Sequence, residues 1–167
     1  ACLRGIAALQ ENPPDIVVFL DADGSDVPED LPEVIAPIVR GEADLVIGSR
    51  LLGGAAAGSL TGLQRFGNRL TAMLVRLIWG HRFTDLGPFR AIRREALARL
   101  GMQDRGFGWT IEMQIRACKQ GLRVTEVPVR YRPRTAGTSK ISGTWLGSLK
   151  AGAKILWTVL RHAVTRG

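Results

Sequence analysis

The residues that most constrain this chain are Asp15 to Asp26, where a short apolar run ends in closely spaced carboxylates. The run Ile16-Val17-Val18-Phe19-Leu20 is rich in β-branched types, which predicts a strand buried on both faces. It ends at Asp21 and Asp23, and the turn residue Gly24 follows. Ligands of open α/β sheets gather at the carboxyl ends of strands, and two carboxylates there provide half a site for a hard divalent cation. An ordinary polar turn is the alternative.

Three known uses of such a motif can be compared with its surroundings. A calcium loop of the helix-loop-helix type needs Gly at its sixth position and Glu at its twelfth. Counted from Asp21 these positions hold Asp26 and Pro32, which excludes that loop. Phosphatases of the haloacid dehalogenase type carry Asp-x-Asp-Gly with the first Asp as nucleophile, but their motif usually opens the domain and continues with Thr rather than Ser25. Nucleotide-sugar glycosyltransferases use Asp-x-Asp to hold a metal on the diphosphate, and later residues favour this third use.

Charge is distributed unevenly along the 167 residues, which suffice for one domain with a real core. The net charge is +8, yet residues 1–50 hold 10 acids and 3 bases, whereas residues 51–167 hold 5 acids and 20 bases. The basic remainder suggests an anionic partner. A basic nucleic-acid-binding module is the competing class, but no nucleic-acid motif is present and the acidic strand exit would repel a phosphate backbone. Cys2 and Cys118 give no disulfide framework or metal spacing.

A second buried strand is predicted over residues 43–50, after a helix that begins near Pro28 and ends at Gly41. A parallel crossover would bring its terminal Arg50 to the same sheet edge as Asp21, as a candidate diphosphate contact. A helix over about residues 63–79 follows. Its apolar stripe is predicted to be core and its arginine face solvated; the stripe comprises Leu63, Phe66, Leu70, Leu74 and Leu77. Further on, residues 124–131 predict a strand, and residues 132–140 a basic, Gly-containing loop suited to phosphate.

Taken in order, these segments resemble the family 2 glycosyltransferases of the GT-A fold, in the polyprenyl- or dolichyl-phosphate sugar synthase branch. The matching residues are Asp21-Ala22-Asp23, Gly48-Ser49-Arg50, Thr84-Asp85 with Phe89-Arg90, Trp109 with Glu112, and Arg132 through Ser139-Lys140. The resemblance implies a Rossmann-like α/β domain over residues 1–142, with a mainly parallel sheet flanked by helices. The chain begins in the middle of a predicted helix without an initiator Met, so we expect a fragment that lacks the family's first strand or strands.

The resemblance also implies roles for individual residues in an inverting, metal-dependent transfer from a nucleotide-diphosphate sugar. Asp21 and Asp23 would hold Mg²⁺ or Mn²⁺, and Ser25, Arg50 and Glu112 would join them in binding the donor. Asp85 would act as the base for a hydroxyl acceptor, or orient the substrates if the acceptor is an ionised lipid phosphate. The acceptor or phosphate contacts would be Arg90, Arg132, Arg134, Ser139 and Lys140. Two departures from the family are Ser25, where many relatives have Gln, and Gly87-Pro88 in place of Ser-Gly.

Residues 143–167 are predicted to form a separate amphipathic helix. Lys150, Lys154, Trp157 and Arg161 fall within about 60° of one another on a helical wheel, beside an apolar arc. A basic face containing Trp next to an apolar face is typical of a helix lying in a membrane interface. We therefore expect a peripheral or anchored enzyme at the cytoplasmic face of the membrane, acting on a lipid-phosphate acceptor. The alternatives are that this helix packs on the domain, or that it leads to membrane segments lost with the fragment.

Overall fold

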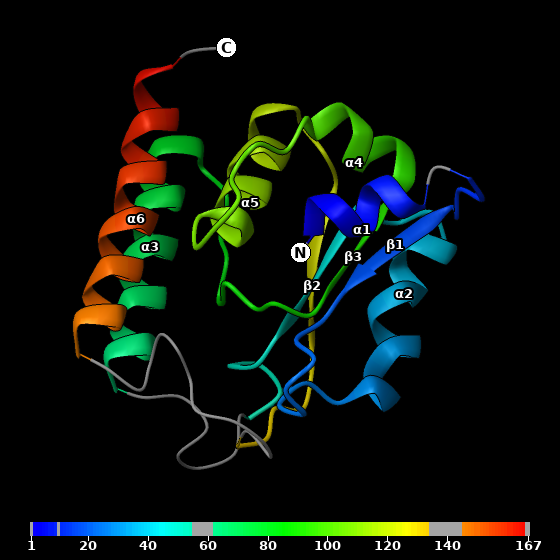
Figure 1. Ribbon diagram of the computed structural model, residues 1–167, viewed down its shortest axis with the longest axis horizontal. Coiled ribbons are helices and arrows are strands. Elements are labelled where there is room, and N and C mark those ends of the chain that lie inside the picture. The colour runs from blue at the N-terminus through cyan, green and yellow to red at the C-terminus, as the bar shows by residue number, and fades with distance from the viewer. Residues whose placement is uncertain (1, 10, 55–61, 134–144, 166–167) are drawn as a thin grey trace.

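The computed structural model describes residues 2–9, 11–54, 62–133 and 145–165. Its elements are a short helix α1 (Cys2–Ala8), the 3-10 turn η1 (Pro28–Asp30), five further helices and four strands (Figure 1). The helices are α2 (Leu31–Val39), α3 (Gly62–Trp79), α4 (Arg94–Leu100), α5 (Trp109–Lys119) and α6 (Trp145–Val164). The strands are β1 (Ile16–Phe19), β2 (Leu45–Ser49), β3 (Arg90–Arg93) and β4 (Val124–Pro128).

The four strands form one sheet in the order β1-β3-β2-β4. β2 and β4 are parallel, and β3 runs antiparallel to both β1 and β2, with Val17 opposite Ile92 and Val46 opposite Ala91. β1 and β2 therefore run in the same direction, and their carboxyl ends reach the same edge, as the sequence predicted. The α/β class is confirmed. The antiparallel strand between β1 and β2 is a feature that the predicted crossover did not include.

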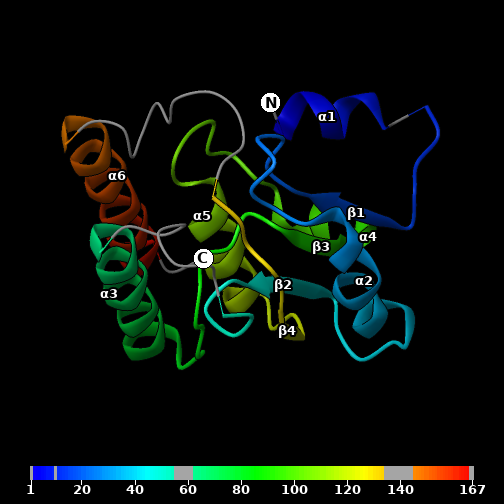
Figure 2. The ribbon, with the colours of Figure 1, turned by 90° about the horizontal axis from the view of Figure 1, so that it is seen from below.

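Each face of the sheet carries its own apolar cluster, because successive side chains of a strand point to opposite faces. Val46 packs with Val34 and Ile38 of α2 on one face. Leu45 and Ile47 face the other cluster, which α4 and α5 build and to which α3 and α6 each add a buried valine. Figure 2 shows α3 and α6 lying alongside each other at one end of the molecule. Both faces of the sheet are therefore covered, and the polar residues that follow its strands lie at its edge.

Strand β1 is not buried on both faces as predicted. Among its residues only Val17 is buried, and Leu20, just beyond the strand, is 45% exposed. In the described sheet β1 is an outer strand that pairs with β3 alone. An apolar run signals that a segment can be buried, but it does not say which other strands complete the sheet around it.

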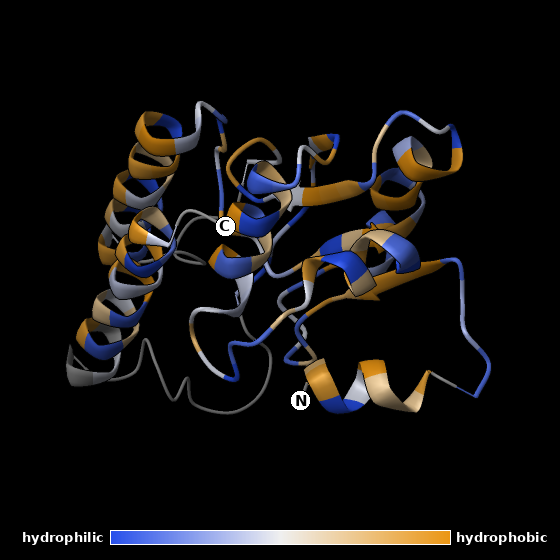
Figure 3. Ribbon diagram, turned by 90° about the horizontal axis from the view of Figure 1, so that it is seen from above, coloured by the Kyte–Doolittle hydropathy of each residue, from blue (hydrophilic) through white to orange (hydrophobic). Residues whose placement is uncertain are grey.

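The prediction that the apolar stripe of α3 is core is wrong for most of the stripe, although Leu74 is half-buried and packs against the core. Phe66 is 64% exposed and Leu77 is 73% exposed, while the buried residues of α3 are Asn68, Thr71 and Val75. Figure 3 shows apolar and polar residues alternating along both α3 and α6. None of the described helices combines the length and hydrophobicity needed to cross a bilayer. Three residues of the stripe, Leu63, Phe66 and Leu77, thus lie on the surface of the described structure.

Candidate active site

The loop after β1 folds around its own carboxylates. Gly24 adopts a positive φ of 78°, which lets the chain turn back. The Ser25 amide then donates to Asp23 Oδ1 at 2.9 Å, and Ser25 Oγ donates to the same oxygen. Asp21 is exposed and Asp23 is half-buried, so both predicted metal ligands can be reached from solvent. Ser25 is 1% exposed and supports Asp23 directly.

A further carboxylate, Asp26, lies beneath this loop and was not singled out from the sequence. It is 3% exposed, and its Oδ2 accepts a hydrogen bond of 2.7 Å from the Asp21 amide. Its Oδ1 is buried with no hydrogen-bond partner in the described part of the chain. Burial, opposed by the bond from the Asp21 amide, raises the pKa of Asp26 to about 6. Asp26 could have been found from the sequence because it lies five residues after Asp21, within the same acidic motif.

The carboxylates suit a hard divalent ion that brings its own water and phosphate ligands. No group of three or more His, Cys, Asp or Glu side chains able to hold a metal is found among the described residues. Mg²⁺ commonly needs only one or two protein carboxylates, because it keeps waters and binds substrate phosphates. Asp21 and Asp23, beside the unpartnered oxygen of Asp26, fit that requirement. They do not form a closed cage of protein ligands.

The segment after β4 closes against the acidic loop. Tyr131 forms an isolated antiparallel bridge with Asp26, and the Arg132 amide donates to the Ser25 carbonyl at 2.9 Å. The exposed side chain of Arg132, predicted to bind acceptor phosphate, therefore projects from a backbone that is tied to the carboxylate loop. The first and the last of the predicted motifs, which contain Ser25 and Arg132, are therefore neighbours in the structure.

Arg50 and Asp85 form a buried ion pair at the same edge. Arg50 Nε lies 2.7 Å from Asp85 Oδ2, and Nη2 lies 2.8 Å from Oδ1. The Arg50 guanidinium also sits over the Tyr131 ring, 5.0 Å from its centroid. Burial disfavours the charge of Arg50, but the bonds and charge of Asp85 outweigh it and the pKa of Arg50 is raised. Arg50 and Asp85, predicted for donor binding and catalysis, are therefore partners of each other.

Three residues that the sequence reasoning missed hold Asp85 in place. Asn68 of α3 donates to Asp85 Oδ1 at 2.7 Å, and Gln114 of α5 donates to the Asp85 carbonyl at 3.0 Å. Glu126 of β4 accepts from the amides of Thr84 and Asp85, and burial raises its pKa. Asp85 itself is 0% exposed. These contacts link segments far apart in the chain, and no local pattern marks them.

Arg90 does not have the surroundings of a phosphate ligand. It is 1% exposed, and its guanidinium donates to the carbonyls of Leu86, Gly87 and Thr110. Burial lowers its pKa to about 10. Arg90 thus holds the backbone of the loop that carries Asp85, and its predicted contact with the acceptor stays a prediction.

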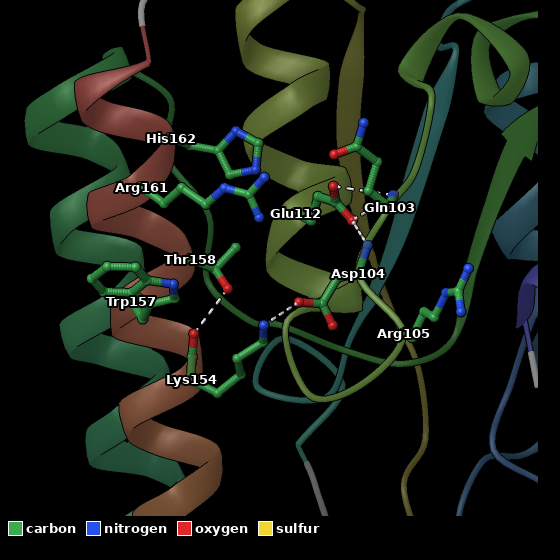
Figure 4. Close-up of a pocket in the computed structure, with 9 residues that line it drawn as sticks. All are labelled: Gln103, Asp104, Arg105, Glu112, Lys154, Trp157, Thr158, Arg161 and His162. Atoms are coloured by element: carbon green, nitrogen blue, oxygen red, sulfur yellow. Dashed lines mark hydrogen bonds and ion pairs between the residues drawn. The ribbon is translucent and has the colours of Figure 1, made fainter.

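Glu112, predicted to bind the donor, lines a separate pocket of about 140 Å³ (Figure 4). It is 2% exposed and accepts from the amides of Gln103 and Asp104 and from Arg116. Asp104 in turn lies 2.9 Å from Lys154 of α6. The pocket is lined by residues of α5, α6 and the 103–105 segment, and none of the strand-end residues Asp21, Asp23 or Arg50 belongs to it. The donor role of Glu112 stays a prediction, and Arg134, Ser139 and Lys140 lie outside the described residues.

Comparison with known sequences gives a family match over most of the chain. A model of glycosyl transferase family 2 matches residues 1–101. An uncharacterised glycosyltransferase of Mycobacterium tuberculosis is 43% identical over 138 residues, which are 81% of this chain and 61% of that protein. An undecaprenyl-phosphate mannosyltransferase of Micrococcus luteus is 32% identical over 80% of this chain and 56% of its own length. The chain thus spans about three fifths of these relatives.

Comparison with solved structures supports the same architecture. Glucosyl-3-phosphoglycerate synthase from M. tuberculosis, crystallised with Mn²⁺, uridine diphosphate and glucosyl-3-phosphoglycerate, superposes with a TM-score of 0.68. The superposition covers 97% of this chain and 53% of the synthase, at 20% sequence identity. At that identity the likeness establishes the fold.

Proposed function

This chain belongs to glycosyl transferase family 2, and on that premise we propose that it transfers a sugar from a nucleotide-diphosphate donor to a polyprenyl phosphate. The observation that carries the proposal is the meeting of an acidic loop and a buried Arg50–Asp85 pair at one sheet edge. The relative that acts on undecaprenyl phosphate supports the choice of acceptor. The Mn²⁺ and uridine diphosphate in the structural neighbour support the choice of donor chemistry.

The acidic loop is proposed to hold the donor through a divalent ion. Asp21 and Asp23 are the ligands, and Ser25 keeps Asp23 oriented through its two hydrogen bonds. When bound, Mg²⁺ or Mn²⁺ supplies Lewis-acid stabilisation of charge on the leaving diphosphate. Arg50 and Arg132 add positive charge beside the loop, which stabilises the anion that develops as the sugar departs.

Asp85 is proposed to orient Arg50 rather than to take a proton. Its two carboxylate oxygens already accept five hydrogen bonds, from Asn68, from the Leu86 amide, and from the amide and two side-chain nitrogens of Arg50. A general base needs a lone pair within reach of the proton that it removes. A polyprenyl phosphate is already ionised and needs no base, so an orienting Asp85 is consistent with that acceptor.

We also propose that α3 and α6 hold the enzyme at the cytoplasmic face of the membrane. The two helices lie side by side and expose large apolar residues, of which the most exposed are Phe66, Leu77, Leu149, Trp157 and Val164. Arg65, Arg69 and Arg76 are exposed on α3, and Lys150 and Arg161 on α6, while neither helix contains Asp or Glu. Exposed apolar and basic residues without acids are typical of interfacial helices, and each cation near an anionic surface contributes about 1 kcal/mol.

The transfer reaction is tested on the full-length protein with labelled nucleotide-diphosphate sugars, undecaprenyl phosphate and Mn²⁺ or Mg²⁺. We expect a lipid-linked sugar that needs the metal, and we expect Asp23→Ala to abolish it. Glu42→Gln, at an exposed carboxylate paired with Arg40, is the matched control and should keep activity. Full transfer in excess chelator would overturn the metal role. Phosphate release from a generic ester, lost in Asp21→Asn, would favour a phosphatase instead.

A further inference from the structure

Asn68 is a buried amide on a helix whose outer face is exposed. It is 8% exposed, on the side of α3 that also buries Thr71 and Val75. Its Nδ2 donates to Asp85 Oδ1 at 2.7 Å. Among the described residues it is the α3 side chain that reaches the Arg50–Asp85 pair.

The bond from Asn68 adds a side-chain donor to those that hold the Asp85 carboxylate against rotation about its bond to Cβ. Arg50 contacts both oxygens, so turning the carboxylate about its bond to Cβ turns the guanidinium with it. The Asp85 backbone is held separately, by Gln114 at its carbonyl and Glu126 at its amide. Asn68 and the backbone amides of Arg50 and Leu86 are the donors outside the guanidinium that hold the carboxylate plane itself.

We propose that Asn68 is a positioning residue, which acts through Asp85 to fix the orientation of the Arg50 guanidinium at the sheet edge. The kinetic part of this inference rests on the transfer reaction proposed above, whereas the geometric part does not. Misplacement of a charged group by about 1 Å can cost on the order of 100-fold in rate, so orientation matters even where the residue touches no substrate.

The alternative is that Asn68 only satisfies a buried acceptor. Substitution would then lower stability without changing how Arg50 is held, because each oxygen of Asp85 keeps other donors. Asn68→Leu keeps the branching of the side chain and removes the donor, and Asn68→Ala is a second variant because the larger leucine has to be accommodated. Thr71→Val is the matched control, because it also replaces a buried polar side chain of α3 by an apolar one.

The first measurement is hydrogen exchange of the Arg50 Nε–H by NMR, with the signal assigned by its loss in Arg50→Lys. We expect exchange at least tenfold faster in Asn68→Leu or Asn68→Ala than in the wild type, and unchanged within about twofold in Thr71→Val. Unchanged exchange in both Asn68 variants overturns the proposal whatever reaction the protein performs.

The second measurement is steady-state transfer by the full-length protein. We expect kcat to fall at least tenfold in Asn68→Leu while KM for the donor changes less than threefold. In the Arg50→Lys background, which keeps the charge but not the two-pronged contact, Asn68→Leu should lower kcat less than threefold further. Equal losses in both backgrounds overturn positioning through Arg50. An inactive wild type overturns the proposed function instead, and leaves the exchange result to decide the role of Asn68.

Discussion

Arg50 and Asp85, 35 residues apart in the chain, meet as a two-pronged buried pair at the end of β2. Side chains of α3, α5 and β4 converge on Asp85, and the Tyr131 ring lies against Arg50. The pair joins the sheet to the loop of residues 84–89, so it is both a structural tie and part of the candidate site. Its two roles can be separated by experiment.

Removing Asp85 should leave a charge buried without its partner. We expect Asp85→Ala to destabilise the fold by about 3 kcal/mol, because an unpaired buried arginine costs more than a paired one gains. The double variant Arg50→Met, Asp85→Leu should recover most of that loss. Urea unfolding of the three proteins measures both effects. A loss below about 1 kcal/mol in Asp85→Ala would contradict the buried pair.

Asp85→Asn tests the catalytic contribution with little change of shape. The amide keeps one acceptor oxygen for Asn68 but loses the charge that holds Arg50. We expect turnover to fall more than tenfold and donor affinity to fall much less, as for a group acting mainly at the transition state. Transfer rates and donor titrations on the full-length protein supply the comparison. Near-normal turnover would leave Asp85 with a structural role only.

Gly87 lies where a side chain cannot fit. A Cβ there would come within 2.2 Å of the Gly48 carbonyl oxygen, so Gly87→Ala must displace either β2 or the Asp85 loop. We expect a loss of about 1–3 kcal/mol in unfolding free energy. Gly67→Ala is the contrasting change, since nothing lies within 4 Å of its Cβ position on α3. It should stabilise the protein by up to about 1 kcal/mol. Equal effects at both positions would contradict the close approach.

His162 should make stability depend on pH. Burial, followed by the charges of Arg116 and Lys119, lowers its pKa below the ordinary 6.5. As pH falls below 6.5, the unfolded chain binds a proton that the folded protein still excludes, so stability present above that pH is lost. We expect His162→Gln to lose less stability than the wild type between about pH 7.5 and about pH 5. Identical pH profiles from thermal unfolding would refute this.

The α3–α6 surface should bind anionic vesicles in a salt-sensitive way. We expect the double variant Phe66→Ser, Leu77→Ser to partition at least tenfold more weakly into phosphatidylglycerol vesicles. Val39→Ser, at an α2 position that is 69% exposed, should bind as the wild type does. Co-sedimentation at low and high salt gives the result. Equal binding to anionic and neutral vesicles, binding to neither, or dimerisation through this face would each argue against the proposed surface.

The elements with strong periodic signals could be predicted from the sequence, and those set by their partners could not. β2 and the helices α3 and α6 appear close to their expected bounds. Amphipathic periodicity shows that α3 has an apolar face, but it does not show which face meets the protein, and the buried face proved to be that of Asn68 and Thr71. β3 was missed because Arg90-Ala91-Ile92-Arg93 is short and charged at both ends.

The residues of the candidate site also fall into two groups, those that the sequence located and those that it did not. The Asp21–Asp23 motif and Arg50 could be located because each follows an apolar strand. The carbonyls around Arg90 and the side chains that support Asp85 lie 3 to 41 residues away from the residues they hold. A single sequence carries no local mark of such contacts.

The position of β3 between β1 and β2 has a consequence for synthesis on the ribosome. β1 pairs only with β3, and β2 only with β3 and β4, in the described sheet. A nascent chain that stops before Arg90 therefore carries two strands with unpaired edges, and contacts distant in sequence form slowly. Within the described sheet, β1 and β2 are joined only once β3 emerges, and β4 adds to β2 later. Strand edges that wait for a partner later in the chain are open to misassembly until that partner emerges.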